Sequence, residues 1–179
     1  MKRDGHGGAE ARALWSFTLA TYDAPGVAPA CIGLQDRHGL DVNLLLFCCW
    51  AGARGHELSP AKLKRLAQGV AGWNAEVVQP LRAVRRRLKP EPSPEVQDLR
   101  GRLLQLEIEC ERQEQVRLVE LMPLEAGAPE PRHAGANLRR YMELKGAPLE
   151  EDSVAELAAL MTGAFPDLPP LLAVWFILP

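Results

Sequence analysis

A short polar segment ahead of a long apolar run holds the residue types best suited to chemistry in this chain. Gln35, Asp36 and His38 precede Asp41 and Asn43 there. Carboxylates, amides and an imidazole this close together can bind a polar ligand or transfer protons. The structural alternative is that Asp41 caps a helix, while the other side chains satisfy backbone groups that a tight turn leaves unpaired. We favour the structural interpretation, and the ligand-binding one stays open.

A basic cluster later in the chain is the second candidate for a binding site. It comprises Arg82, Arg85, Arg86, Arg87 and Lys89. Guanidinium groups bind phosphates and carboxylates in bidentate geometry, so the cluster could hold an anionic ligand or an acidic partner. On a helix, however, these residues spread over much of the circumference, and cations are also favourable at a solvated helix C-terminus. No aromatic residues are interleaved with them, which disfavours nucleic-acid binding by base stacking.

The polar segment and the basic cluster form one site only if the fold brings them together. In that case we expect a small-molecule site, binding or catalytic, built from Gln35, Asp36, Asp41, Asn43, Arg82, Arg85 and Arg86. No Ser-His-Asp, phosphate-loop or dinucleotide signature accompanies these residues. The sequence therefore names no reaction, no catalytic residue and no cofactor.

Acidic and thiol side chains give little support for a metal site. Glu107, Glu111 and Glu114 share one face of a predicted helix, but no histidine lies on a predicted core helix to complete the Glu-x-x-His pairs of a di-metal bundle. We expect this acidic face to be solvated or to pair with a basic neighbour. The four cysteines lack the paired CxxC spacing of zinc sites and suit the role of small buried hydrophobic residues. We therefore predict no metal.

Composition limits the classes of protein to which this chain can belong. Of its 179 residues, 47% are hydrophobic and 25% are charged, which suits a globular protein with one core. The formal net charge of −2 argues against a generally nucleic-acid-binding surface. We see no signal peptide and no apolar run of membrane-spanning length. Together with the cysteine usage, this predicts a cytoplasmic location.

Helical signals predict how the candidate residues are positioned. Asp41 is placed as the N-cap of a helix over 42–53, which is apolar on every side and should lie at the centre of the core. A Ser-Pro pair begins each of two longer helices, over 59–88 and 94–122, and these should form an antiparallel hairpin. Pro80 falls inside the first of them, where its missing N–H predicts a kink.

No segment alternates with a period of two, so we predict an all-α protein. Its architecture would be a compact helical bundle with a buried central helix and a long antiparallel helix hairpin. The Gly-rich residues 1–8 are predicted to be disordered, and residues 9–122 to form a helical core domain. A linker rich in proline, glycine and alanine would follow over 123–136, and a small C-terminal helical extension over 137–179.

Two motifs extend over much of the predicted core. The first is LWxFxL from Leu14 followed by LQDxxGxDVNLLLF from Leu34, and the second runs from Trp73 to Lys89. They resemble an uncharacterised bacterial family of about this size, whose members are conserved hypothetical proteins with a domain of unknown function. The resemblance covers about residues 13–122. It implies a bacterial, cytoplasmic helical domain, and it brings no activity, cofactor or site residue with it.

The missing catalytic signature and the apolar C-terminal segment over 174–178 lead to a functional expectation. We expect a non-enzymatic helical module in the cytoplasm that binds a protein partner or forms a homo-oligomer. The alternative function is the small-molecule site built on the polar segment and the basic cluster.

Overall fold

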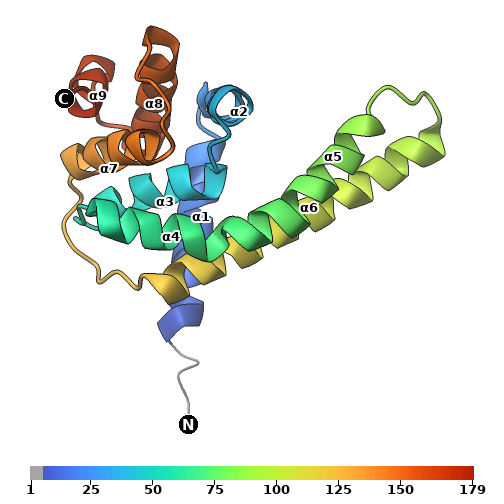
Figure 1. Cartoon of the computed structure of the whole chain (residues 1–179), viewed down its shortest axis with the longest axis horizontal. Helices are drawn as coiled ribbons and strands as arrows, with labels where there is room; N and C mark the ends of the chain where they lie inside the picture. Colours follow the sequence, from blue (N-terminus) through green and yellow to red (C-terminus); the bar gives the residue numbers. More distant parts are fainter. Residues whose placement is uncertain (1–5) are drawn as a thin grey trace.

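The computed structural model describes residues 6–179, and this part of the chain contains helices and no strand (Figure 1). Its elements are α1 (His6–Tyr22), α2 (Val27–His38), α3 (Val42–Ala53), α4 (Pro60–Trp73), the π-helical turn η1 (Asn74–Val78), α5 (Gln79–Arg87), α6 (Pro94–Leu121), α7 (Pro131–Leu144), α8 (Glu151–Ala164) and α9 (Pro170–Ile177). The predicted all-α class is confirmed.

Helix α3 occupies the centre of the core, as its apolar sequence predicts. Every residue from Asn43 to Gly52 is buried. The helix begins at the predicted position, because the Asp41 carboxylate accepts hydrogen bonds from the backbone N–H groups of Asn43 (2.9 Å) and Leu44 (3.4 Å). Helices α1, α2, α6, α7 and α8 all contact α3, so its apolar residues are covered on each side.

Helices α4 and α5, joined by η1, pack along α6 and form the predicted hairpin, whose tip projects from the body of the molecule (Figure 1). Ser59 and Ser93 cap the two halves, each accepting a backbone N–H from three residues further on. Pro80 has no N–H with which to continue the helical ladder. The π turn accommodates it, since the Gln79 N–H donates to the Asn74 carbonyl five residues earlier. The irregularity predicted at the proline is therefore a local widening of the helix.

The ends of two predicted segments differ from the structure. Helix α7 begins at Pro131, six residues before the predicted start of the C-terminal extension at 137, so the connection between α6 and α7 is confined to 122–130. Proline suits the first helical position, and the Glu130 carboxylate accepts the Arg132 N–H, so this helix starts inside a stretch with the composition of a linker. Helix α1 begins at His6, within the segment predicted to be disordered. The remainder of that segment, residues 1–5, lies outside the described residues.

The C-terminal helices share one core with the rest of the protein. Leu138 and Tyr141 of α7 belong to the same cluster of buried residues as α3. Gly52 of α3 allows the two helices to approach, since a Cβ at this position would lie 2.6 Å from the backbone nitrogen of Ala134. The predicted separation into a core domain and a small extension is thus replaced by one continuous core. None of the described helices has the length and apolar content needed to cross a membrane.

Candidate ligand-binding cleft

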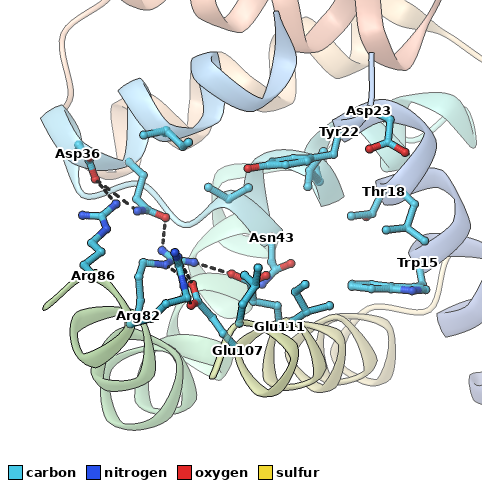
Figure 2. A pocket seen from close by; sticks show the side chains of 18 of the residues that line it. Trp15, Thr18, Tyr22, Asp23, Asp36, Asn43, Arg82, Arg86, Glu107 and Glu111 are labelled. Carbon is cyan, nitrogen blue, oxygen red and sulfur yellow. Dashed lines mark hydrogen bonds and ion pairs between the residues drawn. The ribbon is translucent and has the colours of Figure 1, made fainter. Parts of the chain in front are cut away.

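A cavity of about 740 Å³, here called the cleft, lies where the hairpin meets the body of the molecule (Figure 2). Its walls come from α1, α2 and the start of α3 on one side, and from α5 and α6 on the other. Six of the seven predicted site residues line it: Gln35, Asp36, Asn43, Arg82, Arg85 and Arg86. The polar segment and the basic cluster, far apart in the sequence, therefore meet at one place.

Arg82 is at the centre of the polar side of the cleft. Only 9% of this residue is exposed, and its Nε donates to Glu107 Oε1 at 2.8 Å. One terminal nitrogen donates to Glu111 Oε1 at 2.5 Å, and the other donates to the side-chain oxygen of Gln35. Arg85 shares the Glu107 carboxylate, to which its Nε donates at 2.5 Å. Glu107 and Glu111 of the acidic face thus pair with the basic cluster, which is one of the two outcomes expected for that face, whereas Glu114 is buried without a basic partner among the described residues.

Helical spacing explains why these side chains meet. Glu107 and Glu111 are four residues apart on α6, and Arg82 and Arg85 are three residues apart on α5, so each pair shares one helix face. The hairpin turns the two faces toward each other at the cleft. Because Arg82 and Glu107 are both buried, deleting Arg82 would leave Glu107 paired with Arg85 alone and Glu111 with no cation in the described part of the chain.

A second ion pair crosses the cleft nearer to solvent. Arg86 Nη2 lies 3.0 Å from Asp36 Oδ1, and about half of each side chain is exposed. The hydrogen bond from Arg86 lowers the pKa of Asp36, and so does a weaker one from Gln35. An ion pair this exposed contributes about 0–1 kcal/mol to stability. Its main effect is to connect α2 with α5 across the opening.

The two glutamates of the cleft have pKa values shifted in opposite directions. Burial of Glu107 opposes its ionisation, but the hydrogen bonds and charges of Arg85 and Arg82 outweigh this and lower its pKa. Burial raises the pKa of Glu111, and the charge of Glu107 adds to this effect against the opposing charge of Arg82. Glu107 is therefore firmly ionised, whereas Glu111 takes up a proton more readily than an exposed glutamate.

Much of the remaining lining is apolar or aromatic. Leu19, Ile32 and Leu104 line the cleft and remain 46%, 47% and 38% exposed. Trp15 and Tyr22 of α1 complete this part of the wall, and the Tyr22 ring extends into the cavity (Figure 2). Burial is the largest of the causes that raise the pKa of Tyr22, so its hydroxyl is a neutral hydrogen-bond donor. Large apolar side chains exposed around a cavity are typical of a ligand site.

Asp41 is the one predicted site residue that does not line the cleft. Besides capping α3, its carboxylate accepts from Asn74 Nδ2 at 3.2 Å, and its backbone N–H donates to Tyr141 Oη at 3.0 Å. The same Asn74 nitrogen donates to Glu114 at 3.3 Å. Burial raises the pKa of Glu114, and the neighbouring Asp41 raises it further, so Glu114 is protonated at neutral pH. Asp41 therefore has the structural role that we favoured for it.

Asn43 is held in the lining by buried polar partners. Gln115 Nε2 donates to Asn43 Oδ1 and to Thr18 Oγ1, both at 2.9 Å. Gln115, Thr18 and Asn74 are not among the residues predicted from the sequence, which identified Glu114 only as part of an acidic helix face. Gln115, Thr18 and Glu114 are polar residues buried in helices, and this departure from the apolar pattern is the signal that could have identified them.

A histidine–serine pair lies away from the cleft. His38 Nε2 is 2.9 Å from Ser153 Oγ, which joins α2 to α8. Ser153 is buried, and neither residue lines the cleft, so the hydroxyl lacks the access to substrate that a nucleophile needs. Within residues 6–179, no group of three His, Cys, Asp or Glu side chains is arranged to hold a metal ion.

Comparison with known proteins identifies the family to which this chain belongs. A family model described as "Protein of unknown function (DUF2390)" matches residues 13–118, which is more than half of the chain. The matched region includes every residue that lines the cleft. Searches of curated proteins and of solved structures gave no match. The resemblance inferred from the sequence motifs is thus confirmed, and the chain belongs to the DUF2390 family of proteins of unknown function.

Proposed function

We propose that this protein binds a small, partly apolar molecule in the cleft and acts there as a binding protein. The observation that carries the proposal is that two segments far apart in the sequence contribute to one cavity. Six polar residues from two distant segments line one cavity, and the same cavity exposes large apolar side chains. Its volume of about 740 Å³ is in the range of small-molecule sites, about 300–1,000 Å³.

The rigidity of the polar wall supports recognition of a ligand. Arg82 is held at once by Glu107, Glu111 and Gln35, so its guanidinium is oriented before any ligand arrives. A buried ion cluster is weak evidence for a stabilising role, since replacing one by apolar residues is often neutral or favourable. Its place beside a cavity therefore favours a role in binding.

The same cluster favours binding over catalysis. Both oxygens of Glu107 accept hydrogen bonds from Arg82 and Arg85, so this carboxylate is not free to take a proton from a substrate. The lining contains no serine, cysteine or histidine that could act as nucleophile or base. Glu111 could donate a proton, but one acid without a partner does not define a reaction.

Three naphthalene probes that differ in charge test the proposal: 1-naphthalenemethanol, 1-naphthoate and 1-naphthylmethylammonium. Binding is followed through amide chemical shifts of the ¹⁵N-labelled full chain. We expect at least one probe to bind and to shift amides of α1, α2, α5 and α6 around the cleft. Leu104→Trp should fill the cleft and abolish binding. Leu106→Trp is the matched control, because Leu106 is exposed on the same helix and outside the lining. No binding by any probe, or binding unchanged by Leu104→Trp, would refute the proposal.

Protein binding, our original expectation, is the second candidate, and a separate surface supports it. Leu171 and Trp175 of α9 are 84% and 61% exposed. Exposed apolar and aromatic side chains on one short helix are typical of interaction surfaces. Light scattering over a range of concentrations should show self-association that Trp175→Gln weakens. A strictly monomeric protein that also retains no partner in a pulldown would argue against this function.

We also propose that the protein works in a reducing compartment such as the bacterial cytoplasm. All four cysteines are free, and three of them are buried. Disulfides persist mainly in oxidising compartments, so four unpaired thiols favour a reducing one. Fractionation of cells that express the full chain checks this, and recovery in an oxidising compartment would contradict it.

A further inference from the structure

Some of the positively charged side chains that line the cleft form ion pairs with carboxylates, and others do not. Each of the three arginines of α5 in the lining pairs with a carboxylate of α2 or α6. Lys89 and Arg100 also line the cleft, yet among the described residues neither forms an ion pair. The cations of α5 are thus already neutralised, whereas these two remain available to a ligand.

Arg100 also carries an unsatisfied donor. Its Nε is buried and has no hydrogen-bond partner in the part of the chain that the structure describes. An unpaired buried donor is unusual, because it lacks the bonds that it would form with water. A rotation of the Arg100 side chain that brings its guanidinium onto a ligand oxygen in the cleft would satisfy it. Carboxylate and phosphate oxygens suit a guanidinium best, since they accept two parallel hydrogen bonds.

The two available cations lie at the end of the cleft nearest the hairpin tip. Arg100, Leu104 and Ile108 line the cleft from one face of α6 at four-residue spacing. With a helical rise of about 1.5 Å per residue, Arg100 stands about 6 Å from Leu104 and about 12 Å from Ile108 along the helix axis. Gln97 donates to the backbone carbonyl just before Lys89, which keeps Lys89 at the same end. The two available cations therefore lie at the outer end of the cleft, and the apolar side chains of Leu104 and Ile108 lie further in along α6.

We propose that the ligand is a small organic anion with an apolar body. Its carboxylate or phosphate would bind Arg100 and Lys89, and its body would lie over Leu104 toward Trp15 and Tyr22. This inference rests on the proposed binding function and adds the charge and the orientation of the ligand. The Tyr22 ring, which extends into the cavity, supplies an aromatic face for that body (Figure 2).

The naphthalene probes, extended by 1-naphthyl phosphate, test the inference. We expect 1-naphthoate or the phosphate to bind at least about tenfold more tightly than the uncharged 1-naphthalenemethanol, with the ammonium probe weakest. Arg100→Gln should weaken binding of the anion about tenfold and leave the alcohol unchanged. Arg102→Gln is the matched control, because Arg102 is exposed on the same helix and outside the lining. Lys89→Gln provides a second variant at an exposed position, where folding is not at risk.

The outcomes separate this inference from the proposed function. Failure of all four probes to bind would refute the binding function itself. Binding of the alcohol or the ammonium probe at the cleft with equal or higher affinity than the anions would preserve that function and overturn the assignment of charge. Anion binding that survives both Arg100→Gln and Lys89→Gln would overturn the assignment of these two residues. Preferred binding of the phosphate or of the carboxylate supports the inference and identifies the anionic group.

Discussion

Replacing Glu114 by glutamine should change how the stability of this protein depends on pH. Glu114 is fully buried, and burial together with Asp41 raises its pKa, so the folded protein holds its proton at neutral pH. In the unfolded chain the same carboxyl has a pKa of about 4.3 and is mostly ionised above pH 5. Folding therefore takes up a proton here. The free energy of unfolding contributed by this residue must fall as the pH rises from 5 to 7.

The size of the effect follows from the number of protons. One proton corresponds to about 1.4 kcal/mol per pH unit, which gives a loss of about 3 kcal/mol between pH 5 and pH 7. Glutamine has the same shape and does not ionise. Its amide can donate toward Asp41 in place of the carboxyl proton and can still accept from Asn74. The stability of Glu114→Gln relative to the wild type should therefore increase by about 3 kcal/mol over this pH range.

Urea unfolding followed by tryptophan fluorescence at pH 5, 6 and 7 measures this difference. The pKa shifts of other groups contribute equally to the unfolding free energies of the variant and the wild type, so they cancel in the difference. Glu120→Gln is the control, since Glu120 is exposed on the same helix and its replacement leaves the buried Glu114 in place. If Glu114→Gln instead differs from the wild type by the same amount at every pH, the folded protein holds Glu114 ionised, and our account of this buried pair is wrong.

Arg82→Ala should lower the free energy of unfolding by about 2–4 kcal/mol in urea titrations, because it removes two ion pairs and leaves Glu107 with Arg85 alone and Glu111 without its cation. A loss below about 1 kcal/mol would show that water reaches the cluster. Gly52→Ala should destabilise the fold by about 1–3 kcal/mol, since the added Cβ would meet the Ala134 backbone at 2.6 Å. Gly101→Ala, at a helical position with open space around it, should stabilise the protein by about 0.5–1 kcal/mol, so equal shifts in Tm for the two variants would contradict the packing. Burial raises the pKa of Cys48, and its thiol should react with alkylating reagents only when the protein unfolds. Rapid labelling of Cys48 in the folded protein, mapped by mass spectrometry, would disprove this.

Local patterns in the sequence were sufficient to predict the central helix and the hairpin. The cap at Asp41, the serine caps and the spacing of apolar residues act over three or four residues, so a window of sequence contains all their partners. The start of α7 was missed, because its first turn has the proline and alanine content of a linker. Which helices share a core depends on close approaches such as that of Gly52 to Ala134, and these residues are far apart in the sequence.

The candidate site, too, could be predicted only in part from the sequence. Residue types and spacing identified six of the residues that line the cleft and one, Asp41, that does not. They could not show that Arg82 contacts Gln35, 47 residues away, or that Arg100 is left with an unpaired donor. The sequence by itself determined the central helix, the hairpin, their caps and the membership of the DUF2390 family. Only the tertiary structure decided that the polar segment and the basic cluster face one cavity, because burial and charge pairing depend on groups that meet through the fold and leave no local periodicity.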